Sequence, residues 1–73
     1  MRGSVVQLMK NRGYGWILGE DGCEVYFEQT ALDGLDFRRL SVGDWVEYEE
    51  QFFGDRLRAG KVKPIAHPDA AGH

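Results

Sequence analysis

Three large aromatic side chains, Tyr14, Trp16 and Tyr26, have a spacing that would gather them on one surface of a β-sheet. Residues alternate faces along a strand, so Tyr14 and Trp16 lie opposite Ile17, and Tyr26 lies opposite Phe27. Pairing Ile17 with Phe27 in a core leaves the three rings outside. Each nucleic-acid base stacked on such a ring contributes about 1–3 kcal/mol, so this surface suits single-stranded nucleic acid.

The alternative for these rings is ordinary core packing. We favour the surface position because Ile17, Val25 and Phe27 already supply apolar side chains for the interior. A contiguous exposed aromatic patch usually marks a binding site.

Basic residues flank the aromatic strand. Lys10 and Arg12 precede it and Arg56 follows a Gly-Asp turn, so each is a candidate for contact with phosphates at the edge of the patch. Phe37 lies in a loop between Asp36 and Arg38. Two interpretations of Phe37 stay open, a further stacking platform or a loop anchor buried against the core.

The strands that position these residues are short and separated by turn signals. We expect them at residues 3–9, 13–18, 24–28, 45–49 and 57–63. The first three should form a meander, followed by a helical turn at 30–32 and a loop at 33–41. Closing five strands into a small barrel removes unpaired edges. The sequence therefore predicts an all-β domain over 1–65 and a flexible tail over 66–73.

Composition limits the function classes. The chain has 73 residues, 42% hydrophobic and 29% charged, which fits one globular domain. The formal net charge of −3 argues against binding to duplex DNA mainly by charge neutralisation. It leaves single-strand binding open, because base stacking adds to phosphate contacts there.

Targeting, redox and catalytic signals are weak. The chain carries no secretory signal or long apolar run, and Cys23 is the single cysteine, so we expect a cytoplasmic protein. Its histidines, His67 and His73, fall in the expected tail. We find no zinc-ligand spacing and no catalytic set, and we expect neither an enzyme nor a metal or other cofactor.

Two segments carry a family resemblance. The stretch Arg12–Ile17 resembles the first ribonucleoprotein motif of the cold-shock domain, Lys-Gly-Phe-Gly-Phe-Ile, and Glu24–Glu28 resembles the second, Asp-Val-Phe-Val-His. Weaker matches in the same register extend the resemblance over about residues 2–63.

The resemblance implies a fold and a role. The fold would be a five-stranded antiparallel Greek-key barrel of the OB type. The role would be binding of single-stranded RNA or DNA with a loose preference for pyrimidines, as an RNA chaperone. The residues implied in base stacking are Tyr14, Trp16, Tyr26 and Phe37, and those implied in phosphate or base contacts are Arg12 and Arg56.

The chain also departs from the family pattern. Gln7 stands where a stacking Trp is typical, Glu28 replaces a His and Gln29 an aromatic residue. Glu28 would repel phosphates and weaken binding; alternatively, Glu28 and Gln29 would hydrogen-bond base edges. These departures also motivate a second hypothesis, a barrel that uses the aromatic rings to dimerise or to bind another protein.

Overall fold

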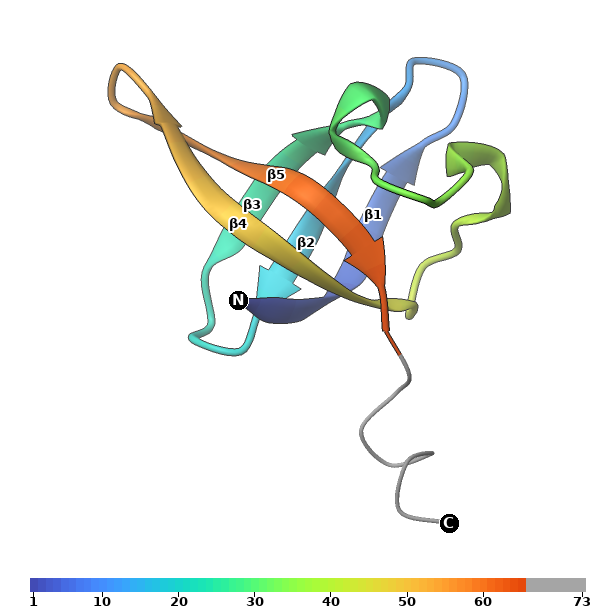
Figure 1. The fold of residues 1–73 in the computed structure, drawn as a ribbon, viewed down its shortest axis with the longest axis horizontal. Coiled ribbons are helices and arrows are strands. Elements are labelled where there is room, and N and C mark those ends of the chain that lie inside the picture. The colour runs from blue at the N-terminus through green and yellow to red at the C-terminus, as the bar shows by residue number, and fades with distance from the viewer. Residues whose placement is uncertain (66–73) are drawn as a thin grey trace, which may run out of the picture.

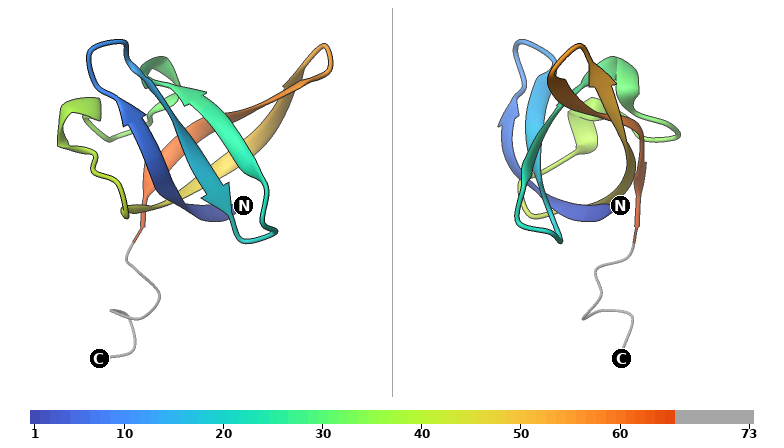
Figure 2. Two further views of the ribbon diagram at one scale, coloured as in Figure 1. Left: turned by 180° about the vertical axis from the view of Figure 1, so that it is seen from behind. Right: turned by 90° about the vertical axis from the view of Figure 1, so that its left-hand side faces the viewer.

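The computed structural model describes residues 1–65 as a closed five-stranded barrel (Figure 1; Figure 2, right). The strands are β1 (Arg2–Met9), β2 (Tyr14–Gly19), β3 (Glu24–Glu28), β4 (Trp45–Phe53) and β5 (Arg56–Pro64). Their order around the barrel is β1-β2-β3-β5-β4. The predicted meander and barrel are confirmed; the domain limits stay a prediction, and the expected tail 66–73 lies outside the described residues.

One strand pair departs from the expected antiparallel arrangement. β3 pairs in parallel with β5 through the Tyr26–Arg58 bridge, whereas the other neighbouring strands are antiparallel. Five strands that alternate in direction around a closed circle must place two of the same direction side by side. The predicted antiparallel Greek-key barrel is confirmed, with this one parallel pair closing it.

The core is the inward face of every strand. Its fully buried side chains include Ile17, Val25 and Phe27, as the alternation predicts. Gly15 is buried between strands, and a Cβ there would lie 2.5 Å from the Gln7 carbonyl oxygen, so only glycine fits this crossing.

The β4–β5 hairpin is longer than the sequence suggested. Gly54, at φ +67°, forms the turn with Asp55, so Phe52 and Phe53 belong to β4 rather than to the turn. In Figure 1 this hairpin projects beyond the rest of the barrel. Its extension brings outward-facing residues of β4 and β5 alongside β3.

Two short 3₁₀ helices pack against the barrel, and the second places Phe37 in the core. They are η1 (Gln29–Ala31) and η2 (Phe37–Arg39), within the connection from β3 to β4. The expected helical turn at 30–32 thus begins one residue earlier. Among the described residues, no helix is long and apolar enough to cross a membrane.

Candidate functional site

The rings of Tyr14, Trp16 and Tyr26 lie against one another on the outer face of β2 and β3; we call them the aromatic cluster. Ring centroids are 5.4 Å apart for Tyr14 and Trp16, 5.6 Å for Tyr14 and Tyr26, and 5.7 Å for Trp16 and Tyr26. All three side chains are half-buried. Their mutual packing holds the rings in place and leaves part of each ring open to a ligand.

Strand register explains the cluster. Trp16 pairs directly with Tyr26 across the β2–β3 ladder, and Tyr14 pairs with Glu28. Paired residues point to the same side of a sheet, so the two strands place all four side chains on one face. Ile17 pairs with Val25 on the opposite, buried face.

Glu28 is held by a network rather than left free. Its carboxylate accepts a 3.1 Å hydrogen bond from the Tyr26 hydroxyl and forms an ion pair with Arg58. Desolvation and the hydrogen bond to Glu28 raise the pKa of Tyr26, so its hydroxyl stays protonated and donating at neutral pH. The neighbouring guanidinium offsets the negative charge that the sequence suggested would repel phosphates.

Arg58, which the sequence analysis did not include among the candidate contacts, lies beside the aromatic cluster. Its guanidinium carbon lies 5.6 Å from the Tyr26 ring centroid and 4.6 Å from that of Phe53. Arg56 lines the same hollow of about 420 Å³ beside the aromatic cluster. Strand alternation places Arg56 and Arg58 on the same face of β5. The predicted strand began at residue 57, after Arg56, so this shared face was not recognised.

Two expected contact residues, Phe37 and Lys10, help to hold the η2 loop in place. Phe37 is 7% exposed, and its ring centroid lies 6.3 Å from that of Phe27 in the core, so Phe37 is the loop anchor and not a surface platform. Lys10 donates from Nζ to the carbonyl oxygens of Phe37, Arg38 and Leu40, at 3.0, 2.9 and 2.6 Å. Its expected phosphate contact stays a prediction; in the structure those carbonyls occupy its donors.

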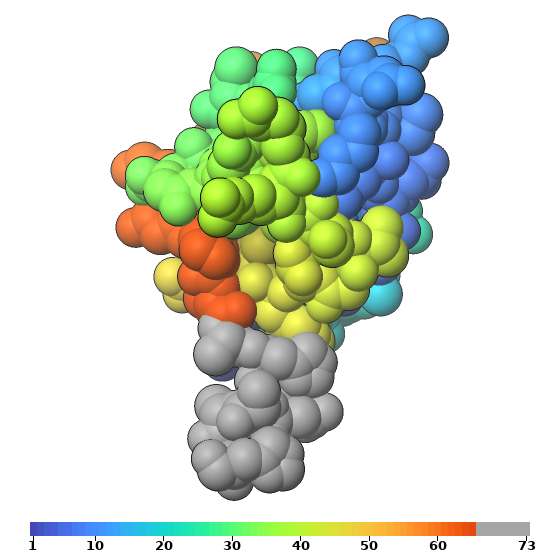
Figure 3. All heavy atoms as spheres, turned by 90° about the vertical axis from the view of Figure 1, so that its right-hand side faces the viewer, coloured from blue at the N-terminus to red at the C-terminus, as the bar shows by residue number. Residues whose placement is uncertain are grey.

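The η2 loop and the β1–β2 turn pack against each other at the surface of the protein. In Figure 3 the loop around η2 lies directly against the β1–β2 turn. Arg12, in that turn, is exposed, as is Gln29, whose amide group lies beside Gly13. Arg12 and Gln29 are therefore placed at the end of β2 where the aromatic cluster begins.

The remaining chemistry is limited. Within residues 1–65, no group of three His, Cys, Asp or Glu side chains is arranged to hold a metal ion. What this face offers is ring surface, guanidinium groups and hydrogen-bonding atoms. Such groups bind and orient a ligand.

Comparison with known proteins adds family information. The family model described as "'Cold-shock' DNA-binding domain" matches residues 1–65. Cold shock protein 2 of Lactiplantibacillus plantarum is 37% identical over 63 residues, covering 85% of this chain and 94% of that protein. The cold shock-like protein of Thermotoga maritima is 32% identical over 65 residues, covering 89% and 98%.

Among solved structures, the chain is similar to Drosophila Unr CSD456. The TM-score is 0.70 at 21% sequence identity, covering 92% of this chain and 27% of that one. At this identity the likeness concerns the fold alone.

Proposed function

Because the chain belongs to the family of cold-shock DNA-binding domains, we propose that it binds single-stranded RNA or DNA on the aromatic cluster. The observation that carries this proposal is the mutual contact of Tyr14, Trp16 and Tyr26 on one outer face. Each ring can stack a base, and stacking contributes about 1–3 kcal/mol per base.

Charge at the cluster supports the same function despite the net charge of −3. Arg56 and Arg58 border the rings, and Arg12 is exposed at the start of β2. Because stacking is tolerant of sequence and arginine contacts follow the backbone, we expect weak sequence preference. A preference for pyrimidines remains part of the proposal.

Fluorescence titration tests binding. Replacing Trp45 by Phe leaves Trp16 as the single tryptophan of the chain, which has two. Oligothymidylate should then quench Trp16 emission with a saturable curve. Absence of quenching and of any heat of binding at low salt and millimolar oligonucleotide would overturn the proposal.

We further propose an RNA-chaperone role for the chain, in the cytoplasm. Binding by stacking favours unpaired strands, so the protein should lower the melting temperature of a fluorophore-labelled RNA hairpin. Trp16→Ala should reduce that effect. A hairpin stabilised by the protein would contradict the chaperone role.

The alternative is a protein-interaction or homodimerising barrel. One observation that motivated it, the negative charge of Glu28, is weakened by the structure. Glu28 is paired with Arg58, so its negative charge does not stand alone beside the rings. Sedimentation at high concentration separates the two: we expect a monomer, whereas a dimer abolished by Trp16→Ala would favour the alternative.

A further inference from the structure

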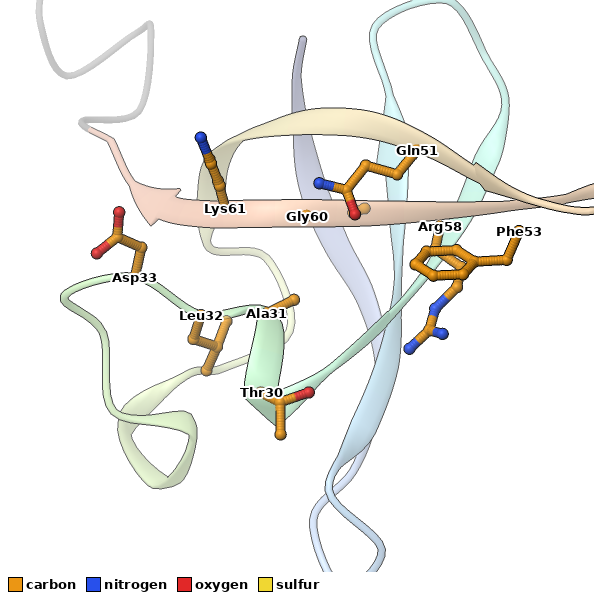
Figure 4. Close-up of a pocket in the computed structure, with 10 residues that line it drawn as sticks. Thr30, Ala31, Leu32, Asp33, Gln51, Phe53, Arg58, Gly60 and Lys61 are labelled. Carbon is orange, nitrogen blue, oxygen red and sulfur yellow. The ribbon is translucent and has the colours of Figure 1, made fainter.

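A second hollow adjoins the aromatic cluster on the other side of Arg58. It has a volume of about 400 Å³ and lies between η1, β4 and β5 (Figure 4). Its lining residues come from these three elements and from the two residues that follow η1: Thr30, Ala31, Leu32, Asp33, Gln51, Phe53, Arg58, Ala59, Gly60 and Lys61. Arg58 lines both hollows, so a ligand crossing it passes from one to the other.

Phe53 provides an aromatic surface in this second hollow. Its side chain is 53% exposed, and its ring centroid lies 4.6 Å from the Arg58 guanidinium carbon. The same guanidinium lies 5.6 Å from the Tyr26 ring. Ring, guanidinium and ring therefore form one continuous surface of groups on which bases can stack.

Lys61 lies at the other end of the hollow from Phe53, and its ammonium points away from Asp33 (Figure 4). β5 carries one extra residue there, because Glu47 pairs with Lys63 while Glu49 pairs with Gly60. This is a β-bulge, a device that redirects side chains. Lys61 has a φ of +50°, where glycine is favoured, so this position carries a side chain in a backbone conformation that is unfavourable for lysine.

The charges of the hollow are compatible with an anionic strand. Lys61 lies 3.8 Å from Glu49, but both side chains are more than half exposed, and such pairs contribute little. Its ammonium can therefore turn to a phosphate. Asp33, the acid that lines the hollow, lies 3.9 Å from Lys63, which offsets its charge.

We infer that this second hollow binds the nucleotides that follow those on the aromatic cluster, with a base on Phe53 and a phosphate at Lys61. The inference rests on the proposed function. Continuity through Arg58 and the exposed Lys61 at the far end favour the same single strand as the occupant.

Oligonucleotide length and a matched pair of variants test the inference. For oligothymidylates of about four and about eight nucleotides, Phe53→Ala should weaken binding of the longer strand about tenfold and leave the shorter one unchanged. Phe52→Ala is the control, because Phe52 is 71% exposed, adjacent in sequence and on the other face of β4. It should change neither affinity.

Lys61→Gly provides a second measurement, in which a loss of affinity cannot come from a loss of folding stability. Glycine relieves the backbone at the bulge, so the protein should remain as stable as the wild type or become more stable. Affinity for the longer strand should fall, and the slope of log K against log salt should become shallower by about 0.7.

The outcomes separate the two proposals. Equal effects of Phe53→Ala and Phe52→Ala, with both strands bound by the wild type, would overturn the second hollow and leave the aromatic cluster standing. Failure of the wild type to bind either strand would overturn both.

Discussion

The aromatic cluster and the η2 loop each place a cation beside an aromatic ring, but only the cluster leaves its ring partly exposed. In each, a cation lies 5.6 Å from a ring: Arg58 from Tyr26, and Lys10 from Phe37. Tyr26 remains half-exposed beside two other rings, whereas Phe37 is buried in the core. A ring next to a cation is therefore insufficient to identify a binding surface.

Backbone geometry accounts for the difference. In β2 and β3 the ladder satisfies the backbone groups, so outward side chains are left for a ligand. The carbonyl groups of Phe37, Arg38 and Leu40 at the short η2 helix all accept hydrogen bonds from Lys10, and that of Phe37 also accepts one from the Leu40 backbone N–H. The strand surface therefore leaves its side chains open to a ligand, whereas the loop carbonyls occupy the donors of Lys10.

Phe37→Ala should give the largest change in stability. Removing a buried Phe costs about 3–5 kcal/mol, a large part of the stability of a domain of this size. Urea unfolding followed by far-ultraviolet circular dichroism measures it, with Phe37→Leu as the milder variant. An unfolding midpoint unchanged in Phe37→Ala would place the ring on the surface and break the contrast.

Trp16→Ala should give the converse result. We expect affinity for oligothymidylate to fall by about 1–3 kcal/mol, measured by calorimetry, with a smaller loss of stability than in Phe37→Ala. If Trp16→Ala unfolded the domain while leaving the affinity of its folded fraction intact, the cluster would be structural.

Lys10 and Arg12, two residues apart in one turn, sharpen the contrast further. Lys10→Met should destabilise the fold by about 1–3 kcal/mol by removing charge-assisted hydrogen bonds. Arg12→Ala should leave stability unchanged and make the salt dependence of binding shallower. If Lys10→Met changed only the salt dependence of binding and Arg12→Ala lowered only the stability, the roles assigned to the two side chains would be reversed.

Glu28→Gln tests whether the ion pair restrains Arg58. Freed from the carboxylate, Arg58 should contact a phosphate, so binding should tighten a few-fold and the salt slope steepen by about 0.7. Glu24→Gln, the same charge change on the same face of β3, is the control. An equal gain in affinity in both variants would show that the effect comes from net charge and not from the release of Arg58.

Tyr48 in the core and Tyr26 in the aromatic cluster should affect the stability of the fold differently at alkaline pH. Burial raises the pKa of Tyr48 to about 12, and among the described residues its hydroxyl has no hydrogen-bond partner. A raised folded-state pKa gives stability that is present below about pH 10 and lost as pH rises through about 12. Tyr48→Phe should reduce this alkaline loss in unfolding experiments, and Tyr26→Phe should reduce it less.

Strand alternation was enough to predict the core and the aromatic cluster. Ile17, Val25 and Phe27 are inside, and Tyr14, Trp16 and Tyr26 share the outer face because the β2–β3 register is direct. Hydrophobic pattern and strand period agree here, so local information determined the faces.

The remaining features depend on contacts between distant segments. Lys10 reaches carbonyls 27 to 30 residues away, a contact that no local pattern contains. Phe53 lies beside Arg58 only because the turn is at Gly54 and both flanking strands run up to it. Ending the fourth strand at residue 49 and beginning the fifth at residue 57 concealed this contact.

Chemical-shift mapping with a short oligothymidylate tests most directly whether bases bind on the aromatic cluster. The amides of residues 14–16, 26–28 and 56–58 should move together and saturate with one dissociation constant, and those of 37–40 should remain still. Shifts confined to 37–40, or the absence of saturable shifts in 14–16 and 26–28, would contradict this account.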